Sequence, residues 1–116
     1  MRFMVMVRAN DQTEAGVLPT AEQLDTMRAF NETLNDDVIM LDGDGLRDSR
    51  SGARLTFSGG KANVAQGPFE TQELIAGFWI VQAKSKEEVV ERFSRAPMEE
   101  GNVLEIRQLF EAEDFG

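Results

Sequence analysis

The sequence predicts an α+β fold of the ferredoxin-like type, βαβ…βαβ with an inserted β-hairpin. The 116 residues fit one domain that spans 1–116. Apolar spacing alternates between strand-like and helical, in the order strand, helix, strand, hairpin, strand, helix, strand. Two runs, Phe3–Val7 and Ile75–Val81, are apolar on both faces, so both faces of the sheet need a cover. We therefore expect helices on one face and a second copy on the other, which makes a homodimer through the sheet face.

The first unit begins with a strand over Phe3–Val7, because this run suits a strand covered on both sides. The polar, turn-rich segment Asn10–Pro19 is predicted to be a loop. Thr20 and Gln23 match a capping box, in which each side chain accepts a hydrogen bond from the other residue's backbone N–H. Apolar residues then recur at helical spacing, which predicts a helix over Ala21–Asn35.

The middle of the chain carries a strand and a hairpin. Val38–Leu41 is the predicted strand, and Asp42–Gly45 closes it with a bulge or bend. Apolar and polar residues alternate over Ala53–Ser58, and Lys61–Ala65 is the return strand. Gly59-Gly60 between them favours a type I′ turn, since glycine readily adopts positive φ.

The second unit starts after a turn at Gln66–Glu70. Leu74–Ala83 is the longest apolar run and predicts a buried strand. A second capping box begins at Ser85 and opens a helix that Pro97 ends. Val103–Phe110 alternates and is the predicted last strand.

Composition excludes several kinds of chemistry. The chain has 12 Lys and Arg against 21 Asp and Glu, a net charge of −9, and it contains no Cys, His or Tyr. Thiol nucleophiles, imidazole bases and zinc sites built on Cys or His are thereby excluded, and we expect no metal and no cofactor. A surface this acidic repels nucleic acid and anionic membranes, so we expect neither as a partner. Arg47, Arg50 and Arg54 are interleaved with acidic residues, which favours a solvated loop.

The N-terminus does not match a signal peptide. Its apolar segment, Phe3–Val7, is shorter than the apolar region of exported chains, and no small-residue cleavage site follows. We therefore expect a cytoplasmic protein.

Two neighbouring segments resemble a known family. Gln66-Gly67-Pro68-Phe69-Glu70-Thr71, followed by Ala76-Gly77-Phe78-Trp79, is similar to the signature of the YCII-related family, in particular its DGPF-motif branch. Further similar segments are Asp42–Leu46, Phe57–Lys61, Lys84–Glu88 and Glu105–Glu111. The resemblance extends over essentially the whole chain and implies a dimeric α+β barrel.

The resemblance implies less about activity. Most DGPF-type proteins have no established reaction, and many are encoded beside extracytoplasmic-function sigma factors, which implies a sigma-factor partner and a role in transcription regulation. A few YCII-related enzymes use a His–Asp pair, as in the dechlorination of a hydroxylated aromatic ring. This chain has no histidine, and Gln66 stands where the motif has its aspartate, so that chemistry cannot be transferred to it.

Three carboxylates are the candidate catalytic groups. Asp42 and Asp44 lie close together at a strand end, and two nearby carboxylates separate their pKa values. Glu70 is the one possible base in the following turn, and Arg47 could hold an anionic group. The structural alternative is that these are solvated loop charges. The pattern fits neither a calcium loop nor a dinucleotide-binding loop, because the required glycine positions are missing.

Candidate ligand-binding residues are Arg47, Gln66, Phe69, Phe78 and Trp79. In an alternating strand Phe78 and Trp79 face opposite ways, and we expect Trp79 to face the dimer surface, where it anchors the interface or stacks on a planar ligand. The structural alternative for Gln66–Glu70 is a plain turn in which Phe69 anchors the chain in the core.

Three functions remain open. The first is a module that binds a small, aromatic molecule in an apolar cavity. The second is a small carboxylate-dependent enzyme, of lyase or hydrolase type, with Asp42, Asp44 or Glu70 as the general base. The third is an accessory protein that a sigma factor recognises through the acidic surface and the tail Glu111–Gly116.

Overall fold

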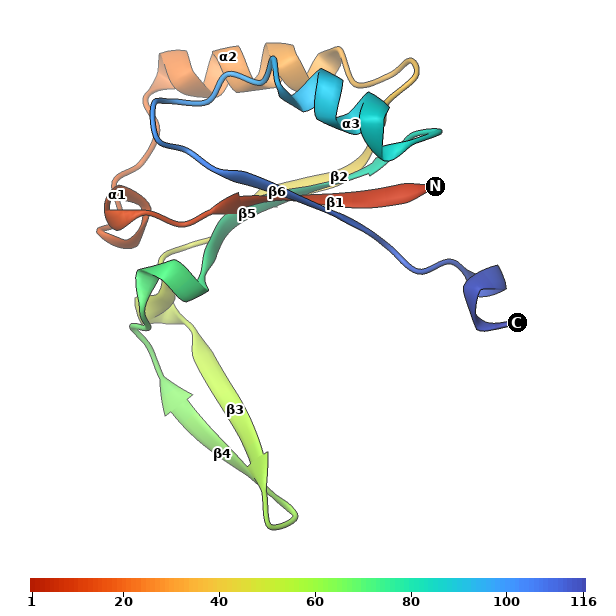
Figure 1. The fold of residues 1–116 in the computed structure, drawn as a ribbon. Coiled ribbons are helices and arrows are strands. Elements are labelled where there is room, and N and C mark those ends of the chain that lie inside the picture. The colour runs from red at the N-terminus through yellow and green to blue at the C-terminus, as the bar shows by residue number, and fades with distance from the viewer.

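A computed structural model describes all residues, 1–116, and shows one four-stranded antiparallel sheet covered by helices on one face (Figure 1). The strand order is β2-β5-β1-β6. The sheet and its helices comprise β1 (Arg2–Arg8), α2 (Ala21–Glu32), β2 (Ile39–Gly45), β5 (Ile75–Gln82), α3 (Lys86–Phe93) and β6 (Leu104–Gln108). This order confirms the predicted ferredoxin-like fold, because the two βαβ units interleave their strands in a single sheet.

The remaining elements lie outside that sheet. They are α1 (Asp11–Glu14), β3 (Ala53–Ser58), β4 (Lys61–Gln66) and three short 3₁₀ helices, η1 (Ser49–Ser51), η2 (Thr71–Glu73) and η3 (Ala112–Phe115). The β3–β4 hairpin turns at Gly59 and Gly60, whose φ values of 59° and 75° confirm the predicted turn chemistry. No helix is long and apolar enough to cross a membrane.

The helix starts follow the predicted caps, and the ends differ. Thr20 Oγ1 accepts from the Gln23 N–H at 3.1 Å, and Gln23 Oε1 accepts from the Thr20 N–H at 2.9 Å. Helix α2 ends at Glu32, before the predicted Asn35, because its last bonds tighten to residues three positions back. Helix α3 ends at Phe93, before Pro97, in the same way.

The prediction of a continuous loop over Asn10–Pro19 is wrong in part. Residues Asp11–Glu14 form a short helix, because Asn10 and Thr13 cap each other as the Thr20 box does. This box carries a threonine at its third helical position, so it lacks the Glu or Gln that marks such boxes in a sequence.

Strand β2 is longer than predicted. Asp42–Gly45 pairs with β5 as strand, although its aspartates and glycines favour turns. The register shifts between Met40 and Asp42, so the bulge lies at Leu41 and not within Asp42–Gly45, where the sequence predicted a bulge or bend. Pairing along the edge of β5 outweighs local turn preference here, since each paired residue gains backbone hydrogen bonds.

The core lies between the sheet and the two long helices. Nine buried apolar residues form it: Phe3, Val5, Leu34, Val38, Trp79, Val81, Ala83, Val89 and Phe93. The Trp79 and Phe93 rings meet edge to face with centroids 5.0 Å apart. The alternation of β1 therefore places Phe3 and Val5 beneath the helices and sends Met4 and Met6 to the opposite face.

Two segments project from the opposite, helix-free side. The β3–β4 hairpin extends from one end of the sheet, and the C-terminal segment with η3 extends from the other (Figure 1). Every hairpin residue is exposed. The radius of gyration is 16.3 Å, against about 13 Å for a compact domain of this length. The single chain thus holds two extensions that its own core does not cover.

Candidate functional site

The face of the sheet without helices forms the candidate site, which we call the open face. Its apolar floor consists of Met4 and Met6 on β1 and Phe78 and Ile80 on β5. All four are partly buried, yet no helix lies above them. Paired residues of neighbouring strands share a face, so the strand register gives the arrangement of this surface.

Two parallel rows of side chains cross the open face. One row runs Asp44–Phe78–Met6–Glu105, and the other runs Asp42–Ile80–Met4–Arg107. Neighbouring strands lie about 4.8 Å apart, so the backbones of β2 and β6 are about 14 Å apart across the sheet. The apolar floor between them is wide enough for a single planar ring.

The bulge in β2 sets the direction of the two predicted catalytic aspartates. Met40 pairs with Val81 on the helix side, whereas Asp42 pairs with Ile80 on the open side. If Leu41 paired in regular register and there were no bulge, Asp42 would share the side of Met40 and enter the core. The structure therefore brings Asp42 and Asp44 to the same face, two positions apart on one strand, as the prediction of a carboxylate pair requires. Asp42 Oδ1 also accepts from the Gly43 N–H at 2.8 Å.

The opposite edge of the open face carries bonded charges. Arg8 Nη1 donates to Glu105 Oε1 at 2.9 Å, and its Nη2 contacts the Gln72 carbonyl oxygen. Arg107 lies 3.8 Å from the other oxygen of Glu105. This edge is therefore close to neutral or weakly positive, and the β2 edge with its aspartates is negative.

Trp79 faces away from this surface, and the expectation that it faces the dimer surface is wrong. Its side chain is 5% exposed and lies beneath the helices. The indole Nε1 donates to Asn31 Oδ1 of α2 at 2.9 Å. Alternation alone separates Phe78 from Trp79, and it does not say which of the two faces the helices. Aromatic partners on α2 and α3 determine that side, because Phe30 and Phe93 both contact the indole ring.

The predicted turn at Gln66–Glu70 forms a second cluster, at the base of the hairpin. Ser49 of η1 connects it: Ser49 Oγ accepts from the Phe69 N–H at 2.9 Å and donates to a Glu14 carboxylate oxygen. The other Glu14 oxygen accepts from the Ser49 N–H at 2.9 Å. A Cβ on Gly67 would lie 1.7 Å from the Ser49 carbonyl oxygen, so this approach needs glycine.

Phe69 does not reach the core, contrary to the structural alternative proposed for the turn. It is partly buried under Arg54, whose guanidinium carbon lies 4.1 Å from the ring centroid. Arg54 also pairs with Glu73 at 3.0 Å. Arg54 therefore links the base of the hairpin to η2, and Phe69 packs against Arg54 outside the hydrophobic core.

The other predicted residues near the turn are exposed. Glu70 caps η2 without a side-chain hydrogen bond, Gln66 ends β4, and Arg47 lies on the loop after β2. Nearby, the Arg50 side chain donates to Asp48 and lowers the pKa of that carboxyl, and burial opposes the shift more weakly. The structure thus groups Asp42, Asp44 and Phe78 on the open face and leaves the turn residues at its end.

Comparison with known families identifies the chain. The profile of the YCII-related domain matches residues 1–113. The chain belongs to the YCII-related family. The DGPF branch stays a prediction, because the match covers the family as a whole.

The comparisons with curated sequences and solved structures give only low similarity for this YCII-related protein. No curated protein sequence matches it. Among solved structures, it is similar to 5-chloro-2-hydroxyhydroquinone dehydrochlorinase from Burkholderia phenoliruptrix AC1100, solved as a complex with 2,5-dihydroxybenzoquinone. The sequence identity is 14%, the TM-score is 0.45, and the alignment covers 98% of each chain.

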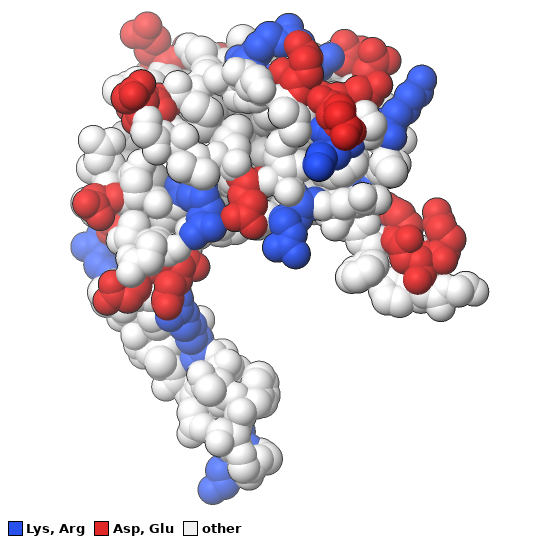
Figure 2. All heavy atoms as spheres, in the orientation of Figure 1, with Lys and Arg blue, Asp and Glu red and all other residues white.

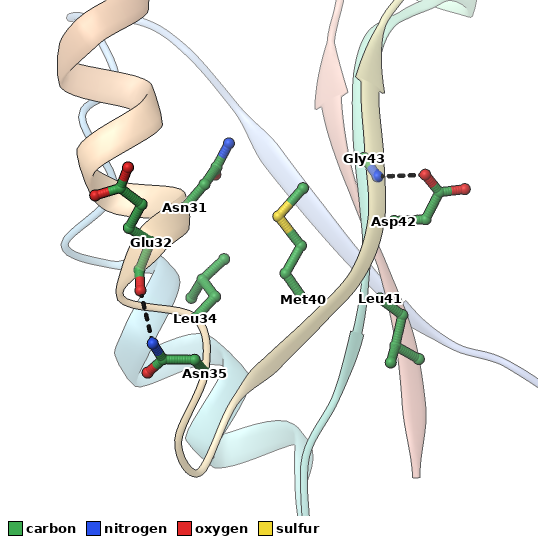
Figure 3. A pocket seen from close by; sticks show the side chains of 8 residues that line it. All are labelled: Asn31, Glu32, Leu34, Asn35, Met40, Leu41, Asp42 and Gly43. Atoms are coloured by element: carbon green, nitrogen blue, oxygen red, sulfur yellow. Dashed lines mark hydrogen bonds between the residues drawn. The ribbon is translucent and has the colours of Figure 1, made fainter.

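The YCII-related domain also has a groove on the helix side of its β2 edge (Figure 3). It has a volume of about 670 Å³ and lies between the end of α2 and β2. Met40 points into it from β2, while Asn35 donates to the Glu32 carbonyl oxygen at 3.0 Å. A Cβ on Gly43 would lie 2.9 Å from the end of the Met40 side chain, so a larger residue there would displace this methionine.

Several residues of both clusters escaped the sequence reasoning. Met4, Met6 and Ile80 on the floor could have been found from their alternation with buried residues, once the helix-covered side was known. No sequence pattern marks Ser49 and Glu14, because they meet only when two distant segments approach the turn.

Proposed function

We propose that this YCII-related protein is a homodimeric module that binds a small molecule with a planar, apolar ring between the open faces of two copies. The observation that carries this proposal is the apolar floor of Met4, Met6, Phe78 and Ile80, which has carboxylates along one edge and no cover from its own chain. Apolar floors with a few polar groups at the rim are typical of small-molecule sites.

A second copy is the occupant that the open face favours. An apolar centre with a charged rim is typical of protein interfaces. The extended shape of the chain supports the same partner, since the hairpin and the C-terminal segment both leave the domain on the open side (Figure 1). Two stacked sheets would bury the floor and leave an enclosed space between them.

Within that space, Phe78 would stack on the ring of the ligand, and Asp42 and Asp44 would accept hydrogen bonds from its hydroxyl or amino groups. Carboxylates that lie next to an apolar surface make strong charge-assisted hydrogen bonds. A ring that carries donor groups therefore fits better than one that carries anionic groups.

Native mass spectrometry of the gently purified protein tests the proposal. We expect a dimer mass with a small added mass, which the Phe78→Ala variant loses while it keeps the dimer. Leu24→Ala, on the exposed side of α2, is the matched control and should retain the added mass. A monomer would contradict the proposal, and so would an added mass that Phe78→Ala leaves unchanged.

A carboxylate-dependent enzyme is the second candidate, because Asp42 and Asp44 lie side by side along the floor. One of them would act as a general base toward a bound small molecule. When the compound released from the dimer is incubated with fresh protein, mass spectrometry should then detect a product. Asp42→Asn or Asp44→Asn should abolish its formation, and Asp25→Asn on α2 should not. Neither the comparisons nor the structure supports the predicted sigma-factor role, and we do not propose it.

A further inference from the structure

The β3–β4 hairpin has one apolar face that nothing in its own chain covers. Leu55 pairs with Val64 and Phe57 pairs with Ala62, so these four side chains share a face. Leu55, Val64 and Phe57 are 56%, 59% and 77% exposed. A two-stranded hairpin is only marginally stable alone in water, so an exposed apolar face of this kind needs a partner.

The charge of the hairpin differs from that of the rest of the chain. Residues 49–69 contain no Asp or Glu, although the protein has a net charge of −9. Lys61 lies at the hairpin tip, and Arg54 lies at its base. Figure 2 shows the hairpin as a mostly uncharged arm with positive charge at its end. A partner surface for the arm should therefore be apolar and acidic.

The C-terminal segment has both properties. Phe110 and Phe115 pack against each other with centroids 5.1 Å apart and remain 73% and 76% exposed. Glu113 and Asp114 lie between them in sequence, and the segment has no basic residue. Figure 2 shows this acidic group at the far side of the open face from the hairpin.

The segment is held in place for docking. Arg2 Nε donates to Glu111 Oε1 at 2.9 Å, which fixes the start of the segment to the end of β1. The Glu111 N–H donates to Asp114 Oδ2 at 2.7 Å and closes η3. The Phe110 and Phe115 rings therefore lie on a segment whose conformation is fixed by these two hydrogen bonds.

We propose that the hairpin of one copy binds the C-terminal segment of the other copy. The proposal rests on the proposed homodimer. In Figure 1 the hairpin and the C-terminal segment lie at opposite ends of the sheet and both bend toward the open side. A two-fold axis perpendicular to that view stacks the open faces and brings each hairpin to its partner's C-terminal segment. Leu55, Phe57 and Val64 then cover Phe110 and Phe115, and Lys61 faces the acidic residues.

Cross-linking between single-cysteine chains tests this contact, because the native chain has no cysteine. Ala62→Cys places a thiol on the apolar face of the hairpin, and the adjacent Asn63→Cys places one on the polar face as the matched control. Each is co-expressed with a differently tagged Ala112→Cys chain and treated with a short bismaleimide. We expect at least fivefold more covalent heterodimer from Ala62→Cys with Ala112→Cys than from the control pair.

The outcomes separate the docking contact from the dimer itself. A native dimer in which Ala62→Cys chains link mainly to one another would overturn the contact, because the hairpins would then pair together. A native dimer that gives equal yields from both pairs would also overturn it. A monomeric mass for the untreated wild-type protein would instead reject the proposed dimer, and the contact with it.

A charge exchange provides an independent test. Lys61→Glu should weaken the dimer at low salt by about tenfold or more in Kd, and Glu113→Lys in the same chain should restore most of the loss. Circular dichroism checks that each variant is folded. A Kd for Lys61→Glu equal to that of the wild type would contradict the proposal.

Discussion

On strand β5, Trp79 and Val81 are buried beneath the helices, whereas Phe78 and Ile80 lie one position away on a face that no helix covers. The two pairs are similarly apolar, so hydrophobicity does not distinguish them. What differs is the cover. Helices from the same chain cover one face and stabilise the fold, and we propose that a second copy covers the other and forms the binding site. Substitutions on the helix side should therefore lower the stability of the fold, and those on the open face should weaken the dimer or ligand binding.

The largest effect should come from the helix side. Phe93→Ala removes the ring that packs against both Trp79 and Phe30, and it leaves a cavity beneath α3. We expect a loss of about 3–5 kcal/mol in the free energy of unfolding. Chemical denaturation followed by circular dichroism measures it. A loss equal to that of Phe78→Ala would break the distinction between the faces.

On the open face, Ile80→Asp should disrupt assembly and leave the fold intact. A carboxylate at the centre of the floor would be buried without a partner in the dimer but solvated in the monomer. We expect the dimer Kd to rise by about a hundredfold or more, measured by analytical ultracentrifugation, with the secondary structure unchanged. Val90→Asp, an exposed apolar position on α3, is the control and should have no effect on Kd.

Trp79→Phe sharpens the comparison at a single position. The variant keeps an aromatic ring in the core and removes the Nε1 donor to Asn31. We expect a loss of about 1–3 kcal/mol in stability, because the Asn31 oxygen loses its partner. Dimer mass and any bound small molecule should be retained. Loss of the bound molecule alone would instead assign Trp79 to the ligand site, contrary to its burial under the helices.

The smallest effect concerns pH, with one ion pair on each side of the sheet. Hydrogen bonds from Arg92 lower the pKa of Asp36 beside the helices, and those from Arg2 lower the pKa of Glu111 at the C-terminal segment. A folded-state pKa below the unfolded value of about 3.9 for Asp or 4.3 for Glu contributes stability above that value. The contribution is lost as the pH falls from there through the folded-state pKa.

Thermal unfolding measured between pH 5 and pH 3 tests this dependence. Asp36→Asn and Glu111→Gln should each reduce the slope of Tm against pH below about pH 4.3. Asp36 is exposed and Glu111 is only partly buried, so the changes should be small. A wild-type Tm that rises as the pH falls through this window would contradict the sign of both shifts.

The sequence predicted the local features of the fold well. The structure confirms the capping box at Thr20, the Gly59-Gly60 turn and the order of the elements, which depend on neighbours within a few residues. At Ser85 only half of the predicted box forms, because the serine side chain accepts from the Glu88 N–H and the Glu88 side chain does not return a bond. The side of the sheet that the helices cover was not predictable, because it depends on packing between β5 and the distant Phe30 and Phe93.

The candidate site could be predicted only in part. Asp42, Asp44 and Phe78 do share a face, but for the aspartates this depends on the exact position of the bulge, which the sequence did not specify. Phe69 was expected in the core and instead packs under Arg54, because the hairpin carries the turn away from the helices. The contact of Ser49 with Glu14 is tertiary, so no local pattern signals it.

The extra residue in β2 also determines which changes of chain length the site can accept. Leu41 is the bulged residue, which has no partner on β5, and it is 48% exposed. A protein that lacked Leu41 would form a regular strand in which Met40 still faced the helices and Asp42 still faced the floor. The loss of Gly43 instead would send Asp44 toward the core. Relatives with a β2 strand shorter by one residue are therefore expected to have lost the residue at position 41 and to have kept both carboxylates.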